Sequence, residues 1–361
     1  MRKNDWKKRI VATFLTITMA AACLDSGCGQ EEGTETKEKE EKQTPDGIYL
    51  YGEAHSNECI QKQELKIWND FYEEGMRDLF YEIPYYDAEI LNIWMREEND
   101  EILDMLWENW SGTSGGEIES YNFFKSLKKE CPGTVFHGTD IGHDYRTSGQ
   151  WYLDYLEERG QRDSGKYRKT QKNMEQGEYY YGHSSDAIYR ENKMVENFIE
   201  EYENLNGASI MGIYGGAHTD IDAMDYMTGT VPCMANQLYE KYGDRLHTKD
   251  LSGKEPIATE KIEVDGKKYQ ASYFGRFDGS TVSDGYESAD YWRLEDSYTD
   301  FKGATVGEEV WNQNGFPMKL KSKQVYMVEL TKEDGTVEPK YFRTDPNSFK
   351  KIGAVKEIVL N

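Results

Sequence analysis

Short apolar runs alternate with longer polar segments through the N-terminal and central parts of the chain. Four of these runs are rich in Ile, Leu, Phe and Tyr, and Gly, Pro or Asp follows each of them closely. Short apolar runs bounded by turn residues are typical of buried strands. The predicted strands cover residues 47–51, 78–82, 134–138 and 208–214.

The segments between these strands have the polar and apolar spacing of helices. Strands that alternate with helices favour an α/β fold with a mainly parallel sheet flanked by helices. The interval between the third and fourth strands is long enough for a helical insertion that acts as a lid. The predicted helices cover residues 60–74, 88–107, 121–129, 150–159 and 185–205.

The pattern changes after about residue 255, where short alternating segments are joined by Asp-Gly turns. Asp265-Gly266 and Asp334-Gly335 each lie between two such segments. Asp-Gly in this setting predicts a tight hairpin. We therefore expect an α/β domain over residues 46–254 and a small antiparallel β appendage over residues 255–361, which either covers part of a cleft or packs beside it.

The N-terminus has the organisation of a secretory signal. Five basic residues precede the apolar run 10–22, which is too short to span a bilayer as an anchor helix. Small residues precede Cys23 and Cys28, and this arrangement resembles the cleavage box of bacterial lipoproteins. Ser-Gly-Cys28-Gly is the more typical phrase, so we expect a signal peptide over residues 1–27 and lipidation of Cys28. Asp25 is unusual in such a box and keeps Cys23 as the alternative, beside an ordinary cleaved signal.

Residues 28–45 are polar and rich in Glu and Lys. Such a segment buries too little apolar surface to offset the entropy of ordering, so it is expected to be a disordered tether. The protein is therefore expected to be exported and lipid-anchored to the outer face of the bacterial cell membrane, with the lipid as its only membrane contact.

The net charge bears on nucleic-acid binding, and the number of cysteines limits the disulfides that can form. The first 22 residues carry five basic groups and one acid, so their removal changes the formal charge from −24 to about −28. A chain this acidic is not expected to bind nucleic acid. Three cysteines remain beyond the signal, Cys59, Cys131 and Cys233, and an odd number permits at most one disulfide.

Two histidines stand in nearly the same six-residue phrase. Residues 51–56 read YGEAHS and residues 214–219 read YGGAHT, each directly after a predicted strand. The carboxyl ends of parallel strands meet at one edge of a sheet, where ligands gather. We therefore expect one shared site. The polar residues at the predicted strand ends are Glu53, His55, Glu82, His137, Asp140, His218 and Asp220.

The glycines in both phrases suit a chain that leaves its strand tightly, through positive φ or through close backbone approach. An imidazole beside a carboxylate suits proton transfer near neutral pH. The same set would also suit a divalent metal, with His55, His218 and either Glu53 or Glu82 as ligands.

Several short motifs of the chain resemble those of a known protein family. Gly52-Glu53-Ala54-His55, Tyr81-Glu82, Gly138-Thr139-Asp140 and Gly215-Gly216-Ala217-His218 are similar to the scattered motifs of the erythromycin-esterase-like and ChaN-like superfamily, with the TraB and TIKI-type proteins as distant relatives. The helix that carries residues 190–197 is similar to the Arg-Asp/Glu-x-x-Met-Ala helix before the last histidine strand of these proteins. The resemblance covers about residues 47–225. His55 is followed by Ser56-Asn57, which is closer to ChaN-like lipoproteins than to the macrolide esterases.

This resemblance implies a polar centre in a cleft at the carboxyl edge of the sheet. It implies catalytic roles for Glu53, His55, Glu82, Arg190 and His218, and Asp140 and Glu191 are expected to bind substrate. His143, three residues beyond Asp140, either lines the cleft as a further substrate-binding residue or lies in solvent.

The first hypothesis for function is a hydrolase acting on an ester or amide bond of a small molecule or peptide. His55 would activate water, while Arg190 and His218 would stabilise or protonate the developing oxyanion. Neither Cys233 nor any serine lies in a recognisable nucleophile elbow, which favours direct attack by water, with or without a metal.

Two alternatives belong to other classes of protein. The resemblance to ChaN-like lipoproteins implies a protein that captures haem or another iron compound without catalysis. The third alternative is a scaffold that presents the β appendage to a partner, in which neither His55 nor His218 would be needed.

Overall fold

The structure of the chain is a computed structural model that describes residues 46–253, 256–279, 282–283, 285–346 and 354–360. The expected signal peptide, the tether, Cys23 and Cys28 lie outside the described residues. Within the described residues, no helix is both long enough and apolar enough to cross a membrane.

A parallel sheet of five strands forms the first part of the fold, with the strand order β3-β2-β4-β1-β5. All of its pairings are parallel, so the predicted α/β class is confirmed. The fifth strand was not predicted, because it lies at an edge and has only one buried residue, Leu246. The strands are β1 (Ile48–Glu53), β2 (Asp78–Pro84), β3 (Val135–Asp140), β4 (Ile210–Gly215) and β5 (Leu246–Asp250).

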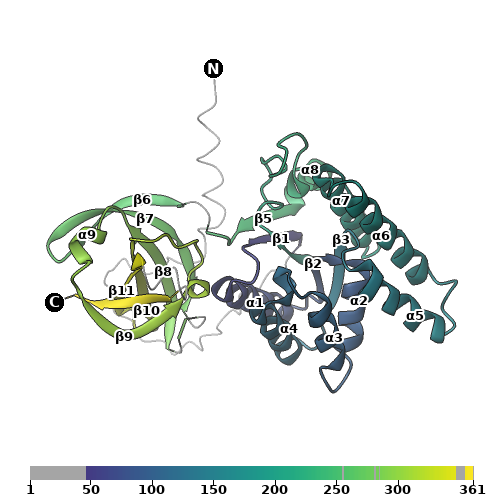
Figure 1. Cartoon of the computed structure of the whole chain (residues 1–361), viewed down its shortest axis with the longest axis horizontal. Coiled ribbons are helices and arrows are strands. Elements are labelled where there is room, and N and C mark those ends of the chain that lie inside the picture. The colour runs from purple at the N-terminus through teal and green to yellow at the C-terminus, as the bar shows by residue number, and fades with distance from the viewer. Residues whose placement is uncertain (1–45, 254–255, 280–281, 284, 347–353, 361) are drawn as a thin grey trace, which may run out of the picture. The chain divides into compact units, whose positions relative to one another are not determined.

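Helices cover both faces of this sheet (Figure 1). Successive side chains of a strand point to opposite faces, so Leu79 and Tyr81 pack with one group of helices while Phe80 packs with the other. The first group is α1 (Glu58–Glu73), α2 (Tyr85–Trp94), α3 (Glu101–Asn109) and α4 (Ile118–Glu130), and the second is α7 (Ala187–Glu203) and α8 (Met234–Tyr242).

The predicted helix over residues 88–107 is wrong, because the chain forms two helices there. Trp94 ends α2, and its indole Nε1 donates to Asp100 Oδ1 at 3.1 Å, just before α3 begins at Glu101. The intervening residues include Asn99 and Asp100, which are poor in a helix interior because their side chains compete for backbone hydrogen bonds.

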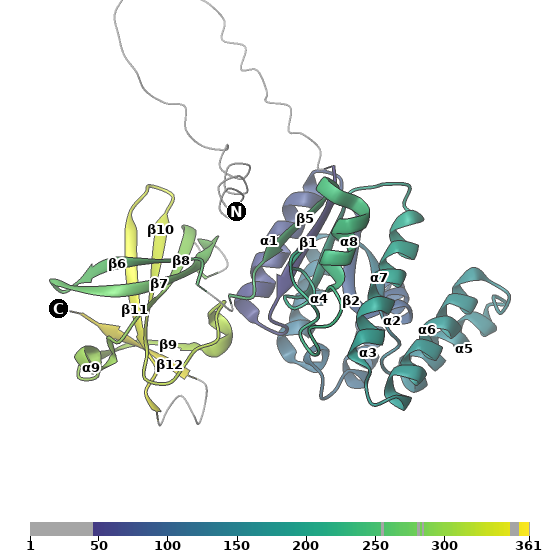
Figure 2. The same cartoon turned by 90° about the horizontal axis from the view of Figure 1, so that it is seen from above.

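The long interval between β3 and β4 is helical, as predicted. It contains α5 (Gln150–Glu158), α6 (Gly165–Gly182) and α7. Figures 1 and 2 both show α5 and α6 side by side, extending beyond the sheet.

The C-terminal part is a seven-stranded sheet with the order β6-β7-β8-β10-β11-β12-β9, in which all pairings are antiparallel. Asp265 and Gly266 both have positive φ between β6 and β7, as a two-residue hairpin turn requires. The elements are β6 (Ala258–Val264), β7 (Lys267–Asp278), β8 (Tyr286–Leu294), α9 (Tyr298–Phe301), β9 (Thr305–Asn312), β10 (Val325–Lys332), β11 (Val337–Arg343) and β12 (Ala354–Val359).

The three cysteines of the described residues, Cys59, Cys131 and Cys233, are buried and free. Burial raises the pKa of each thiol. The fold of the described residues therefore forms without a disulfide.

Candidate active site

A cleft of about 290 Å³ opens at the carboxyl ends of β1, β2 and β3. Every lining residue lies between residues 53 and 190, so the antiparallel sheet contributes none of them within the described chain. Polar groups line part of the cleft and aromatic rings line the rest. The lining includes Glu53, His55, Tyr81, Glu82, Asp87, Trp110, Phe124, Asp140, His143, Asp144, Tyr181 and Arg190.

His55 is the open imidazole of the cleft, with a side chain that is 41% exposed. Its Nδ1 lies 2.8 Å from Oε1 of Glu53, whose side chain is only 2% exposed. Its Nε2 faces Glu82 Oε2 at 3.8 Å. Burial opposes protonation of His55, but the charges of Glu82 and Glu53 outweigh it and raise the pKa of His55 to about 9. A buried carboxylate therefore orients a ring that is open to solvent.

Glu82, at the end of β2, lies between the two histidines of the repeated phrases. The Gly215 N–H donates to its Oε2 at 2.5 Å, and Arg190 Nη2 donates to its Oε1 at 2.6 Å. Burial opposes ionisation of Glu82, but the positive charges of His218, His55 and Arg190 lower its pKa to about 2. Glu82 is therefore an anion that fixes the groups around it.

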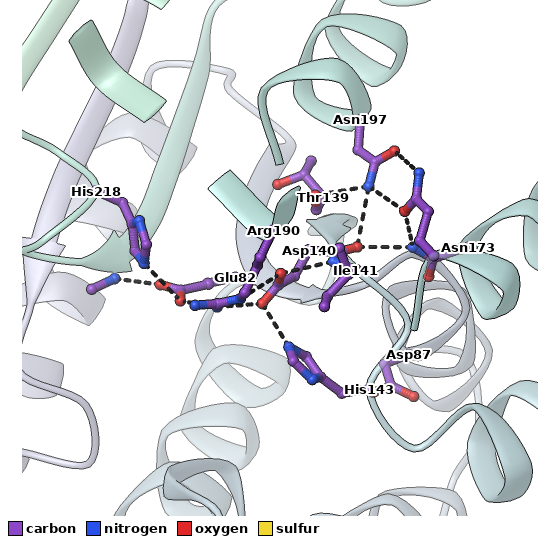
Figure 3. Close-up of polar contacts among 12 residues, drawn as sticks. Glu82, Asp87, Thr139, Asp140, Ile141, His143, Asn173, Arg190, Asn197 and His218 are labelled. Carbon is purple, nitrogen blue, oxygen red and sulfur yellow. Dashed lines mark hydrogen bonds and ion pairs between the residues drawn. The ribbon is translucent and has the colours of Figure 1, made fainter. Parts of the chain in front are cut away.

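His218 is not among the residues that line the cleft, and Figure 3 shows it on the opposite side of Glu82 from Asp140 and His143. Its side chain is 5% exposed, its Nδ1 lies 2.8 Å from Glu191 Oε2, and its Nε2 lies 3.5 Å from Glu82 Oε1. Glu191 also accepts from the Met234 N–H at 2.5 Å. Burial opposes protonation of His218, but the charges of Glu82 and Glu191 outweigh it and raise the pKa of His218 above its usual value.

The two phrases meet because β1 and β4 are paired in register, with Glu53 opposite Gly215. A Cβ atom on Gly215 would lie only 2.9 Å from His55 Nε2. Gly52, Gly215 and Gly216 are not among the glycines with positive φ. The close approach of the His55 ring to the backbone therefore requires the glycine at position 215.

Arg190 joins β2 and β3 to α7. Its Nε donates to Asp140 Oδ1 at 3.0 Å and its Nη2 to Asp140 Oδ2 at 2.6 Å, in addition to the bond to Glu82 (Figure 3). Its Nη1 makes no hydrogen bond within the described part of the chain. Burial opposes ionisation of Asp140, but Arg190 and His143 hold its pKa well below its usual range.

His143 is the second imidazole that lines the cleft. Its Nε2 lies 3.0 Å from Asp140 Oδ2 and its Nδ1 lies 2.6 Å from the hydroxyl of Tyr181. Sequence reasoning missed Tyr181, Asp87 and Trp110 as lining residues. Tyr181 is the last of three consecutive tyrosines, and that run carries no motif that would have singled it out.

His137 and Asp220 do not join the cleft. His137 lies between Asp78 (2.9 Å) and Glu201 (3.2 Å), on a larger cavity of about 520 Å³ at the opposite end of β3. The charged groups of that cavity largely neutralise one another, as in the pair of Lys172 with Glu200. Asp220 is exposed and accepts from the Asp222 N–H.

The donor arrangement does not fit the metal site that the sequence suggested. His55 Nε2 and His218 Nε2 face oxygens of one carboxylate, Glu82, whose charge Arg190 already balances. Among the described residues, no three His, Cys, Asp or Glu side chains are arranged to hold a metal ion.

No family model matches the chain, and the comparison with curated proteins finds no match. Among solved structures, the chain is similar to a Bacillus cereus protein at 12% identity and TM-score 0.39, covering 62% of this chain and 70% of that one. It is similar to a mutant of the erythromycin esterase EreC in its open conformation at 12% identity and TM-score 0.43, covering 62% and 74%. It is also similar to the type III effector HopBA1 at 10% identity and TM-score 0.33, covering 62% and 85%.

Proposed function

We propose that the protein is a hydrolase in which His55 activates water for attack on an ester or amide carbonyl. One observation carries the proposal: the exposed His55 ring lines the cleft and is held at Nδ1 by the buried carboxylate of Glu53, while its Nε2 lies beside Glu82, another residue of the cleft. A carboxylate at one ring nitrogen fixes the tautomer and strengthens the other nitrogen as a base.

Each residue of the centre then has a separate role. His55 Nε2 takes a proton from water as the water oxygen bonds to the carbonyl carbon. Arg190 Nη1 donates to the oxyanion that forms, because it lies on a cleft-lining guanidinium whose other nitrogens are committed. Since His218 does not line the cleft, it acts as a positioning residue that holds Glu82.

The test is the hydrolysis of a panel of esters and amides by the full chain and by His55→Asn. We expect His55→Asn to lower kcat/KM by about 100-fold or more, the usual contribution of a general base. His183→Asn is the matched control, because His183 is exposed and does not line the cleft. Equal activity of the wild type and His55→Asn would overturn the assignment of the base.

The same purified protein also distinguishes the hydrolase from the haem-binding alternative. A ChaN-like haem protein would develop a Soret band when haem is added and would hydrolyse no substrate in the panel. Membership of the erythromycin-esterase-like and ChaN-like superfamily also stays a proposal, supported by the order of the motifs at Glu53, Glu82, Asp140 and His218.

A further inference from the structure

Three further polar residues, Tyr181, His143 and Asp140, line the cleft together with His55 and form a hydrogen-bonded series. The hydroxyl of Tyr181 lies 2.6 Å from Nδ1 of His143, and Nε2 of the same ring lies 3.0 Å from Asp140 Oδ2. The result is a hydroxyl, an imidazole and a carboxylate in series. Such a series transfers a proton to or from its hydroxyl end, with the carboxylate stabilising the charged imidazole.

The inner end of this series is rigid. The Asp140 side chain is 1% exposed, and it accepts hydrogen bonds from Arg190 and from the Ile141 N–H at 2.7 Å. The backbone of His143 is held as well, because its carbonyl accepts a hydrogen bond from the buried Tyr86 hydroxyl. The imidazole therefore has a fixed partner at Nε2 and a fixed backbone.

The outer end of the series is open to the cleft. Tyr181, in the last turn of α6, is 50% exposed and is among the cleft-lining residues. Tyr179, two residues earlier, is similarly exposed, but its ring stacks on His183 and it does not line the cleft. Tyr181 therefore presents a phenol to the space that His55 also faces.

We propose that Tyr181 is the general acid of the reaction and donates its proton to the leaving group, with His143 and Asp140 restoring that proton. This assignment rests on the proposed hydrolase function. It deepens that function by naming the substrate class: esters or amides whose leaving group must be protonated as it departs.

The protons and bonds balance through the cycle. Water bonds to the carbonyl carbon and gives one proton to His55. When the tetrahedral intermediate collapses, the bond from carbon to the leaving oxygen or nitrogen breaks, and that atom takes the Tyr181 proton. The phenolate oxygen takes the Nδ1 proton of His143, which becomes neutral. Solvent then removes the proton from His55 and returns one to His143.

The charges around the series favour its starting state. Burial opposes protonation of His143, but Asp140 raises the pKa of the ring overall. Burial raises the pKa of Tyr181 to about 12, so the phenol keeps its proton near neutral pH, and the raised pKa of His143 favours the imidazolium beside it. The titratable and charged groups that act on the pair are Asp140, Asp144, Arg190, Tyr180, Tyr86 and Asp87.

The experiment compares two esters of one acid, an activated aryl ester and an alkyl ester, with the full chain as enzyme. An activated aryl oxide leaves without a proton, whereas an alkoxide needs one. Tyr181→Phe keeps the ring and removes only the hydroxyl. We expect kcat/KM to fall about 100-fold or more for the alkyl ester and to stay within about threefold for the aryl ester.

Tyr179→Phe is the matched control and should leave both rates unchanged. A nitrogen-15 NMR titration gives a second readout, because Tyr181→Phe should shift the His143 Nδ1 resonance while Tyr179→Phe should not. Equal losses on both esters, or no loss on either, would overturn the role of Tyr181.

The two proposals fail in different ways. Suppose that the wild type hydrolyses both esters, that His55→Asn abolishes both activities and that Tyr181→Phe changes neither. The proposed hydrolase function is then supported, and only the role of Tyr181 as general acid is contradicted. If the wild type hydrolyses neither the aryl nor the alkyl ester, nor any amide of the panel, both proposals fall together.

Discussion

At the scale of single residues, the negative charge of Glu82 is surrounded by the imidazoles of His55 and His218 and the guanidinium of Arg190. One carboxylate faces two imidazoles and accepts from one guanidinium. Each imidazole has a second carboxylate of its own, Glu53 for His55 and Glu191 for His218. Glu82 is held by the Gly215 N–H and by Arg190, and its charge, with those of Glu53 and Glu191, raises the pKa of the two imidazoles.

The raised pKa of His55 predicts the pH dependence of the reaction. His55 must be neutral to accept a proton from water, and its pKa is about 9. Below pH 9 the neutral fraction therefore rises about tenfold with each unit of pH increase. We expect kcat/KM of the wild type to rise from about pH 6 to about pH 9, and the residual activity of His55→Asn to lack this rise. A profile that falls over this range would contradict the assignment of His55 as the base.

The close approach at Gly215 predicts the effect of one added methyl group. In Gly215→Ala the Cβ would lie 2.9 Å from His55 Nε2 and 3.3 Å from Glu82 Oε2, so the imidazole has to move. We expect kcat/KM to fall by about 10-fold to 100-fold, since a displacement of about 1 Å has a cost of this order. Gly303→Ala is the control, because a Cβ there meets nothing within 4 Å. Full activity of Gly215→Ala would mean that the ring position is not critical.

At the scale of elements, α7 ties three strand ends together through two adjacent residues. Arg190 reaches Glu82 on β2 and Asp140 on β3, while Glu191 reaches His218 after β4. Figure 3 shows His218, Glu82, Arg190 and Asp140 in one continuous series. The packing of α7 on the sheet therefore also positions the residues of the site.

This coupling predicts that Arg190 is needed for stability as well as activity. Arg190→Gln leaves two buried carboxylates without their cation, which typically costs about 3 kcal/mol of unfolding free energy or more. Denaturant unfolding at neutral pH measures this loss. Lys193→Gln, which breaks the exposed pair with Glu196 on the same helix, should cost less than about 1 kcal/mol. Equal stability of both variants would show that the Arg190 pairs are not coupled to folding.

The sequence predicted the strands and their polar ends because apolar runs followed by glycines leave a local signal. It missed α6, whose residues GKYRKTQKNMEQGEYYYG carry few apolar side chains and so no clear helical stripe. It also gave no indication that Tyr181 meets His143, 38 residues away. Contacts between distant polar residues depend on tertiary packing, which local patterns do not encode.

At the scale of the whole molecule, we propose that a lipid on Cys28 holds the protein at the membrane. Cys28 lies outside the described residues, and the proposal rests on the phrase Ser-Gly-Cys28-Gly after the apolar run 10–22. In a bacterial host, labelled palmitate should enter the wild type and Cys23→Ala but not Cys28→Ala. Labelling of Cys28→Ala together with loss of label in Cys23→Ala would transfer the anchor to Cys23.

The three buried thiols, Cys59, Cys131 and Cys233, have a practical consequence for reagents that attack cysteine. Alkylating dyes need an accessible thiolate, and burial both shields these sulfurs and raises their pKa. Once the segment that carries Cys23 and Cys28 is removed, a cysteine introduced on the exposed surface of α6 would be the preferred target of such a dye. A fluorophore could thus be attached near the cleft without first replacing Cys59, Cys131 or Cys233.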